Sequence, residues 1–388
     1  MIRWRGGVVR AVGKSWPGAV EITVDADALD DNDSNGDGNN DNSNGDGSNS
    51  AERTEPSGVV RALAFTHMVG EPQPGDRVLL NTTALDLGLG TGGFAHVVAL
   101  PDRLPADPPP GPGHLVKARY TPLQATVLGA DEQDSPWHET LREADDLEGM
   151  PVVTADLHSA LPAIVAGIRT GSATPRVAYV MTDGGALPMW LSRTVSGLRE
   201  AGWLAGTVTV GQAFGGDHEA VTLHTGLLVA RHVIKADVAV VAQGPGNLGT
   251  GTKWGFSGVA CGEAVNATVI LGGRPVASLR VSEADARPRH HGVSHHSLTA
   301  YGRVALTSAD VVVPELTGEF GQKVTDQANR LRGRHNVVAV PVTGLDHALR
   351  ETPVRLSTMG RGLDEDHAYF LAAAAAGRHA EALLHHDS

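Results

Sequence analysis

The chain has 388 residues, a length that suggests two domains, and 41% of the residues are hydrophobic, which is enough for a buried core. Most of the net charge of −13 comes from residues 25–55, where ten acidic residues accompany one arginine, so the remainder carries only about −4. This near-neutral remainder disfavours a nucleic-acid-binding protein, which would show a basic face. The single cysteine, Cys261, excludes a disulfide framework within the chain and a cysteine-rich zinc module.

Targeting signals are not evident in the sequence. No stretch approaches the roughly 18 consecutive apolar residues of a membrane span. The first seven residues also lack the apolar region of a signal peptide. We therefore expect a cytoplasmic protein with no membrane partner.

Residues 1–100 predict a small β-barrel, SH3-like or OB-like. Short runs rich in Val, Leu and Ile, bounded by Gly and Pro, predict strands at residues 2–12, 18–24, 58–65, 77–81 and 94–100. An Asp/Asn-rich insertion, about residues 28–54, separates the second strand from the third and is expected to be disordered, because it offers almost no apolar surface to bury. It resembles the start of a calcium-binding EF-hand loop, but a solvated segment is the favoured interpretation because the flanking helices are missing.

Residues 101–112 contain six prolines and predict a stiff linker. From residue 113 to residue 388 the pattern alternates between strands and helices. Val-rich runs predict buried strands at residues 152–154, 177–181, 207–210, 238–242, 276–281, 311–313 and 337–342. Helical patterns cover residues 157–168, 190–200, 219–232, 257–271 and 365–386. This alternation predicts an α/β domain with a doubly wound, mainly parallel, Rossmann-like sheet and a C-terminal helix.

Polar or glycine-rich clusters directly follow five of the predicted strands. Because ligands of open parallel sheets bind at the carboxyl ends of the strands, we expect a shared site there. The clusters contain Asp156 with His158, Asp183, Asp217 with His218, the loop 243–253, and residues 282–287 ahead of a histidine-rich stretch. The alternative is that these loops are polar and glycine-rich only because loops generally are.

The loop 243–253, which we call the glycine loop, is the predicted anion-binding element. Its glycines allow backbone N–H groups to converge, and the N-terminus of a following helix would add positive potential. The residues expected to hold a phosphate or carboxylate are Gly244, Gly246, Gly249, Thr250, Gly251, Thr252 and Lys253. It is not a Walker A loop, because Thr252 stands between the last glycine and Lys253. A tight turn that only packs a helix against the sheet is the alternative.

Residues 290–296 contain four histidines. His291 and His295 are four residues apart, so on a helix they would share one face and could hold a divalent metal together with Asp156 and His158. However, Pro288 and Gly292 argue for a helix that starts later, with Ser294 as its N-cap. In that case the imidazoles would fan out and only one or two would reach a common point. Metal-free acid–base histidines and a structural cluster remain alternatives.

The predicted catalytic residues are Asp217, His218, His295, His296 and Asp183, with Asp156 and His158 completing the pocket. For Asp217 the alternative is helix capping, because it could be the N-cap of the predicted helix 219–232. Cys261 is expected to pack inside the helix after the glycine loop, since nothing nearby favours a thiolate.

Six segments along the chain are familiar in combination. They are IRWRGG at 2–7, VLLNTTAL at 78–85, KARYTPLQ at 117–124, AFGGD at 213–217, GTGT at 249–252 and HHGVSHH at 290–296. In these segments the chain resembles a bacterial family described as domain of unknown function 3866. The resemblance covers almost the whole chain apart from the Asp/Asn-rich insertion, and it implies no particular activity, cofactor or catalytic residue.

These observations favour an enzyme, a hydrolase or transferase, that acts on a small anionic substrate with or without a divalent metal. One alternative is a non-catalytic sensor or assembly module that binds a metabolite and uses the barrel to engage a partner. Another is weak nucleic-acid binding by the barrel through Arg3, Arg5, Arg10 and Arg61, which rests on fold analogy alone. Whether the chain forms a homo-oligomer is left open.

Overall fold

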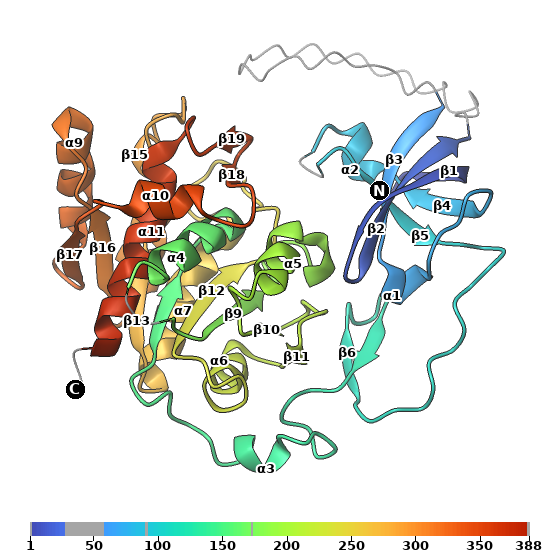
Figure 1. Cartoon of the computed structure of the whole chain (residues 1–388), viewed down its shortest axis with the longest axis horizontal. Helices are drawn as coiled ribbons and strands as arrows, with labels where there is room; N and C mark the ends of the chain where they lie inside the picture. The colour runs from blue at the N-terminus through green and yellow to red at the C-terminus, as the bar shows by residue number, and fades with distance from the viewer. Residues whose placement is uncertain (1, 28–57, 90–91, 172–173, 386–388) are drawn as a thin grey trace. The chain divides into compact units, whose positions relative to one another are not determined.

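The computed structural model describes residues 2–27, 58–89, 92–171 and 174–385, which form two compact units, residues 1–108 and 109–388 (Figure 1). The boundary between the units lies inside the proline-rich segment 101–112. The Asp/Asn-rich insertion at 28–54, predicted to be disordered, lies outside the described residues. No helix in the described ranges is both long and apolar enough to cross a membrane.

The first unit contains a closed barrel with the strand order β1-β2-β3-β5-β4, which confirms the predicted five-stranded barrel. The strands are β1 (Trp4–Trp16), β2 (Ala19–Ala26), β3 (Val59–Ala64), β4 (Arg77–Asn81) and β5 (Ala95–Ala99), with short helices α1 (Thr66–Val69) and α2 (Thr83–Asp86). Pro17 and Gly18 connect β1 to β2, and the φ of 82° at Gly18 suits the third position of a type II turn. Alternate residues Val20, Ile22 and Val24 point into the barrel and are buried.

The second unit is built on an eight-stranded sheet with the order β11-β10-β9-β12-β8-β13-β16-β17. All neighbouring strands in it are parallel. Its strands are β8 (Pro151–Thr154), β9 (Val177–Thr182), β10 (Gly206–Thr209), β11 (His218–Glu219), β12 (Val238–Gln243), β13 (Arg274–Ser278), β16 (Asp310–Pro314) and β17 (Asn336–Val340). The predicted parallel sheet is therefore confirmed. Four of its inner strands, β8, β9, β12 and β16, are rich in Val, as expected where both faces of a strand are buried.

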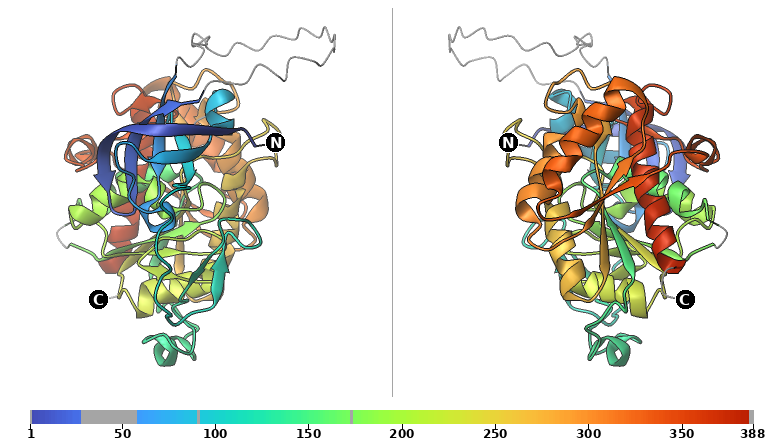
Figure 2. Two further views of the ribbon diagram at one scale, coloured as in Figure 1. Left: turned by 90° about the vertical axis from the view of Figure 1, so that its right-hand side faces the viewer. Right: turned by 90° about the vertical axis from the view of Figure 1, so that its left-hand side faces the viewer.

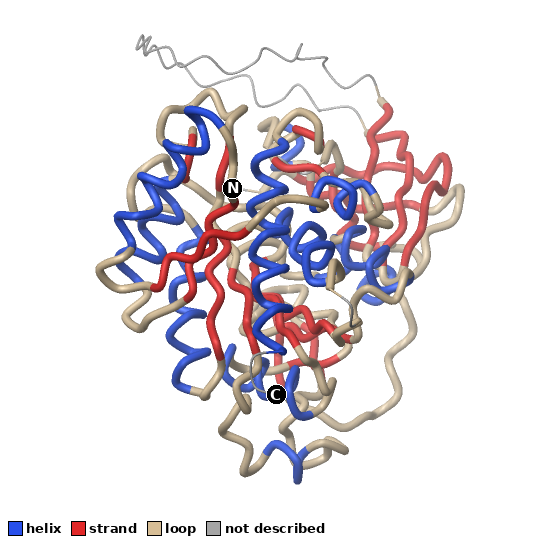
Figure 3. The backbone as a smooth tube through the Cα atoms, turned by 60° about the vertical axis from the view of Figure 1, so that its left-hand side comes forward, coloured by secondary structure: helices blue, strands red, loops and turns tan. Residues whose placement is uncertain are grey.

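Helices cover both faces of this sheet (Figures 2 and 3). The helices α4 (Leu161–Ile168), α5 (Arg193–Glu200), α10 (Leu345–Arg350) and α11 (His367–Ala382) contribute to the core that contains Val153 and Val240. The helices α6 (Leu223–His232), α7 (Ala260–Ile270) and α9 (Gly318–Ala328) pack on the cores of the other face. Neighbouring residues of one strand thus reach opposite cores, as in Val152 and Val153 of β8.

The C-terminal helix α11 packs closely against α4 and the sheet. Its alanine run, residues 372–376, is buried, and the small side chains let the helix backbone approach its neighbours. Gly167 of α4 and Gly377 of α11 lie at the crossing of the two helices. A Cβ atom on Gly167 would collide with the carbonyl of Ala374, and one on Gly377 would collide with the carbonyl of Ile164.

Short elements complete the second unit. Before the sheet come β6 (Leu115–Lys117), β7 (Ala125–Val127) and α3 (His138–Leu141). After β13 come the hairpin strands β14 (Val281–Ser282) and β15 (Gly292–Val293), then α8 (His295–Thr299), which continues as a π-helical turn (Ala300–Val304). The hairpin β18 (Ser357–Thr358) and β19 (Arg361–Gly362) precedes α11.

The predicted start of the helix at Glu219 is wrong. His218 and Glu219 form the edge strand β11, and α6 begins at Leu223 with Thr222 as its N-cap, whose side chain accepts a hydrogen bond from Thr225. Asp217 is therefore not a helix cap. Its carboxylate instead accepts hydrogen bonds from the backbone N–H and the hydroxyl of Thr207, which attach the edge strand to β10.

Candidate functional site

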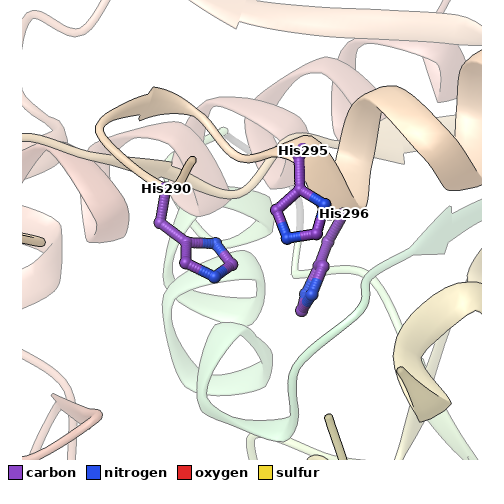
Figure 4. Close-up of side chains that lie close together, drawn as sticks. All are labelled: His290, His295 and His296. Atoms are coloured by element: carbon purple, nitrogen blue, oxygen red, sulfur yellow. The ribbon is translucent and has the colours of Figure 1, made fainter. Parts of the chain in front are cut away.

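Three histidines from the histidine-rich stretch meet at one point (Figure 4). One ring nitrogen of each of His290, His295 and His296 lies within 4.8 Å of those of the other two. The ring centroids are 4.9 Å apart for His290–His295 and for His290–His296, and 4.4 Å apart for His295–His296. We call these three residues the histidine triad.

Local structure explains why the triad forms. Ser294 is the N-cap of α8 and accepts a hydrogen bond from the backbone N–H of His296, so the predicted cap is confirmed. His295 and His296 therefore open the helix, while the β14–β15 hairpin turns the chain so that His290 returns toward them. The expectation that only one or two imidazoles reach a common point is wrong, because it did not include this hairpin.

His296 is buried beside Phe256, which comes three residues after the glycine loop. Its ring stacks on Phe256 with the centroids 3.8 Å apart and the planes 1° from parallel. Its Nδ1 accepts a 3.4 Å hydrogen bond from the guanidinium of Arg280 and lies 3.8 Å from Oδ2 of Asp156. Asp156 comes two residues after the last residue of β8, so the triad lies at the carboxyl end of that strand. The Asp156 side chain is only about one-twentieth exposed, and its Oδ2 has no hydrogen-bond partner among the described residues.

Burial keeps two of the histidines neutral. Burial, together with neighbouring positive groups such as Arg280, lowers the pKa of His290 to about 3 and the pKa of His295 to about 4. At neutral pH both rings therefore carry a lone pair. The Nε2 atom of His295 is buried without a hydrogen-bond partner among the described residues.

The arginines behind the triad are balanced by a buried pair of aspartates. Arg280 and Arg287 both contact Asp285, at 3.7 Å and 2.7 Å. Arg361 of the β18–β19 hairpin pairs with Asp366 at 2.9 Å and lies 3.7 Å from Asp285. This network holds the hairpin that carries His290, and its two carboxylates offset most of the arginine charge.

A pocket of about 580 Å³ opens beside the triad and shares His295 with it. Four cationic side chains line this basic pocket, and no aspartate or glutamate occurs among the described residues that form its wall. Its lining consists of Gly251, Lys253, Arg289, His295, Leu298, Thr299, Gly302, Arg303, Arg330 and Leu331. The cations come from four different segments, namely the glycine loop, the loop before β15, the π-helical turn and the end of the α9 region.

The glycine loop contributes only partly to this pocket. Gly251 and Lys253 line it, whereas Gly249 pairs with Phe256 and Thr250 donates its N–H to the carbonyl of Gly255, so the loop folds back on itself. Gly244 and Gly246 lie nearer to β12, and Thr250 and Thr252 contact each other through their hydroxyls at 3.1 Å. The side chain of Asn247 accepts from the N–H of Gly258, so it occupies the start of the helical segment that was expected to face an anion.

Comparison with known proteins assigns the chain to a family. Residues 61–377 match the family described as Protein of unknown function (DUF3866). The chain belongs to this DUF3866 family. The matched range includes the triad, the basic pocket and the glycine loop. Neither the comparison with curated proteins nor that with solved structures gives a match.

In this DUF3866 protein, two of the predicted metal ligands are not part of the triad and contact other residues. His291 contacts the ammonium group of Lys323 through its Nδ1 at 2.7 Å and packs against Phe320. His158 lies between Tyr179, 3.0 Å from its Nδ1, and Ser192, 2.7 Å from its Nε2. Of the four predicted ligands, only His295 belongs to the triad, and Asp156 lies behind it.

The remaining predicted catalytic residues lie toward the other edge of the sheet. Asp217 pairs with Arg199 at 2.8 Å and directly precedes His218 of β11. Asp183 follows β9 and accepts from the N–H of Gln212. Four strand spacings separate β11 from β8, which is about 19 Å at about 4.8 Å per spacing. Asp217 and His218 therefore do not join the triad.

Two further points concern a buried cysteine and the site residues that the sequence did not indicate. Cys261 lies in α7 as expected, and burial raises the pKa of its thiol, so it remains protonated. The sequence reasoning missed His290 as a member of the triad and missed the pocket cations Arg289, Arg303 and Arg330. Arg289 stands next to the histidines and could have been noticed, whereas Arg303 and Arg330 reach the pocket only through the fold.

Proposed function

We propose that this DUF3866 protein is an enzyme, a hydrolase or transferase, that binds a small phosphate- or carboxylate-bearing substrate in the basic pocket beside its Rossmann-like sheet. The observation that carries the proposal is a pocket with four cationic side chains, no carboxylate in its described wall and a histidine shared with a buried triad. Its volume of about 580 Å³ is in the range of small-molecule sites.

The cations suit an anionic group. Arg289, Arg303 and Arg330 offer planar guanidinium forks, which bind carboxylate or phosphate through paired hydrogen bonds, and Lys253 adds a point charge. Because no acidic side chain of the described wall neutralises them, a bound anion would meet a favourable potential. The triad then supplies what hydrolysis or group transfer needs next to a bound anion, either acid–base imidazoles or metal ligands.

Anion binding is the first test. We expect isothermal titration calorimetry to detect binding of inorganic phosphate to the full chain and expect Arg330→Ala to weaken it about 10-fold or more, the loss typical of one charge-assisted hydrogen bond. Arg332→Ala is the matched control, because Arg332 is exposed and bonds Asn329 rather than lining the pocket. Equal losses in both variants, or no binding to the wild-type chain, would contradict the assignment.

Turnover separates catalysis from binding alone. With a chromogenic phosphate monoester we expect slow hydrolysis that His295→Gln abolishes while phosphate still binds. Phosphate binding without turnover of any phosphate or carboxylate ester would instead favour the non-catalytic sensor.

A further inference from the structure

We propose that His290, His295 and His296 are the three protein ligands of a divalent transition-metal ion such as Zn²⁺, with Asp156 as the carboxylate behind His296. The role of the ion in catalysis rests on the proposed function, but the site itself rests on the geometry of the triad. Of these four residues only His295 also lines the basic pocket, and none belongs to the glycine loop.

The separation of the nitrogens is close to what an ion requires. A tetrahedral ion with metal–nitrogen bonds of about 2.0 Å holds its nitrogen ligands about 3.3 Å apart. The triad nitrogens lie within 4.8 Å of one another, and the three rings face a common space (Figure 4). The difference is at most about 1.5 Å, which rotation of the His290 and His295 side chains would have to close.

Hydrogen bonds around the triad leave suitable lone pairs. Ser294 Oγ accepts from the backbone N–H of His296 and lies 2.8 Å from Nδ1 of His290. A hydroxyl oxygen has two lone pairs, so it can also accept the Nδ1–H of His290, which leaves the Nε2 of that ring free to bind a metal. Nε2 of His295 is buried without a partner among the described residues, and metal binding would satisfy it.

Asp156 gives the second, independent observation. Its Oδ2 is buried and has no hydrogen-bond partner within the described ranges, yet it lies 3.8 Å from Nδ1 of His296. A buried carboxylate is costly unless a donor or cation compensates it. In this structure Arg280 donates a hydrogen bond to the same Nδ1 at 3.4 Å. A metal ion at Nε2 would place the proton of the ring on Nδ1, so this long hydrogen bond would give way and Nδ1–H would turn to Asp156, as metal-bound histidines commonly donate to a carboxylate. The stacking of His296 on Phe256 fixes the ring plane.

The charges and the open side agree with such a site. Arg280 lies 3.7 Å from Asp285, which offsets its charge, and the buried Oδ2 of Asp156 remains to offset the ion. Three protein nitrogens leave a fourth position of a tetrahedral ion open, as in catalytic rather than structural zinc sites. Since His295 also lines the basic pocket, an oxygen of the anionic substrate or a water molecule would fill that position.

The test is a titration of the chelator-treated full chain with Co²⁺, followed by its visible absorption, and with Zn²⁺ by calorimetry. We expect one equivalent to bind with the intense absorption of four-coordinate Co²⁺. His290→Gln and His296→Gln should each weaken binding at least 10-fold, and so should Asp156→Asn, a loss typical of removing a carboxylate behind a ligand. His291→Gln is the matched control, because His291 neighbours the triad but contacts Lys323.

Absence of Co²⁺ and Zn²⁺ binding by the wild-type chain would overturn the proposal without reference to any variant. Equal weakening by His291→Gln and His290→Gln would overturn it too, because binding would then be nonspecific. Circular dichroism identifies variants that do not fold. If a variant does not fold, the proposal is tested by whether the wild-type chain binds one equivalent of the metal ion. Phosphate binding is measured on metal-free protein, so the two proposals are tested separately. If phosphate binds but Co²⁺ and Zn²⁺ do not, only the metal site is refuted. If the metal ions bind but phosphate does not, only the proposed function is refuted.

Discussion

Acid should destabilise the α/β unit through His158. Burial lowers the pKa of this imidazole from 6.5 to about 4. The hydroxyl of Tyr179 donates to the carbonyls of Ala242 and Gln243, so its oxygen can accept the Nδ1–H of His158. The hydroxyl of Ser192 donates to Nε2 of the same ring. Protonation of Nε2 would break the second of these bonds. The folded state therefore prefers the neutral ring.

The sign and size of the effect follow from these pKa values. Because the pKa is lower in the folded state, the unfolded chain takes up the proton first, so stability is intact above about pH 6.5 and falls as the pH drops toward about 4. The full difference corresponds to about 3 kcal/mol, of which about 2 kcal/mol is already lost at about pH 5.

Urea denaturation followed by circular dichroism at about pH 8 and about pH 5 tests this prediction. His158→Gln cannot titrate, so it should be the less stable protein at the higher pH, and its deficit relative to the wild type should shrink by about 2 kcal/mol at the lower pH. His347→Gln, a change at an exposed histidine of α10, is the control and should show no such narrowing. A deficit of His158→Gln that stays constant between the two pH values would refute the reasoning.

Three further predictions concern the stability of the same unit. Lys117 is buried, donates to three backbone carbonyls and lies 3.4 Å from the carboxylate of Glu219. Lys117→Met should therefore lower the free energy of unfolding by about 3–5 kcal/mol in urea denaturation. A loss below about 1 kcal/mol would contradict a stabilising role of the buried pair. Gly377→Ala should destabilise by about 1–3 kcal/mol in the same assay although alanine is the better helix former, because its Cβ would collide with α4; a stabilised variant would refute this packing. The hydrogen bond from His379 lowers the pKa of Asp310, so His379→Leu should reduce stability at neutral pH by about 1 kcal/mol, with the difference vanishing as Asp310 protonates in acid; a deficit that persists below about pH 3 would argue against this cause.

Much of the architecture could be predicted from local sequence patterns. The barrel strands and the parallel strands appear in the sequence as short Val-rich runs. A strand buried on one face alternates apolar and polar residues, and a strand buried on both faces is a continuous apolar run. The cap at Ser294 was readable for the same reason, since a cap depends on neighbouring residues alone. The edge strand β11 was mistaken for the start of a helix, because two residues carry no periodicity and the hydrogen bonds that hold Asp217 come from Thr207, ten residues away.

The candidate site was predictable only in part. The sequence by itself determined which residue types are available at the strand ends: the histidine-rich stretch, Asp156 after β8 and Lys253 in the glycine loop. The tertiary structure alone decided which of them meet. Strand order keeps Asp217 about four strand spacings from Asp156, the β14–β15 hairpin returns His290 to His295 and His296, and Arg303 and Arg330 reach one pocket from separate helical segments. The physical reason is that local pattern reports burial and hydrogen bonding along a segment, whereas convergence of side chains depends on crossovers and packing between segments distant in the chain.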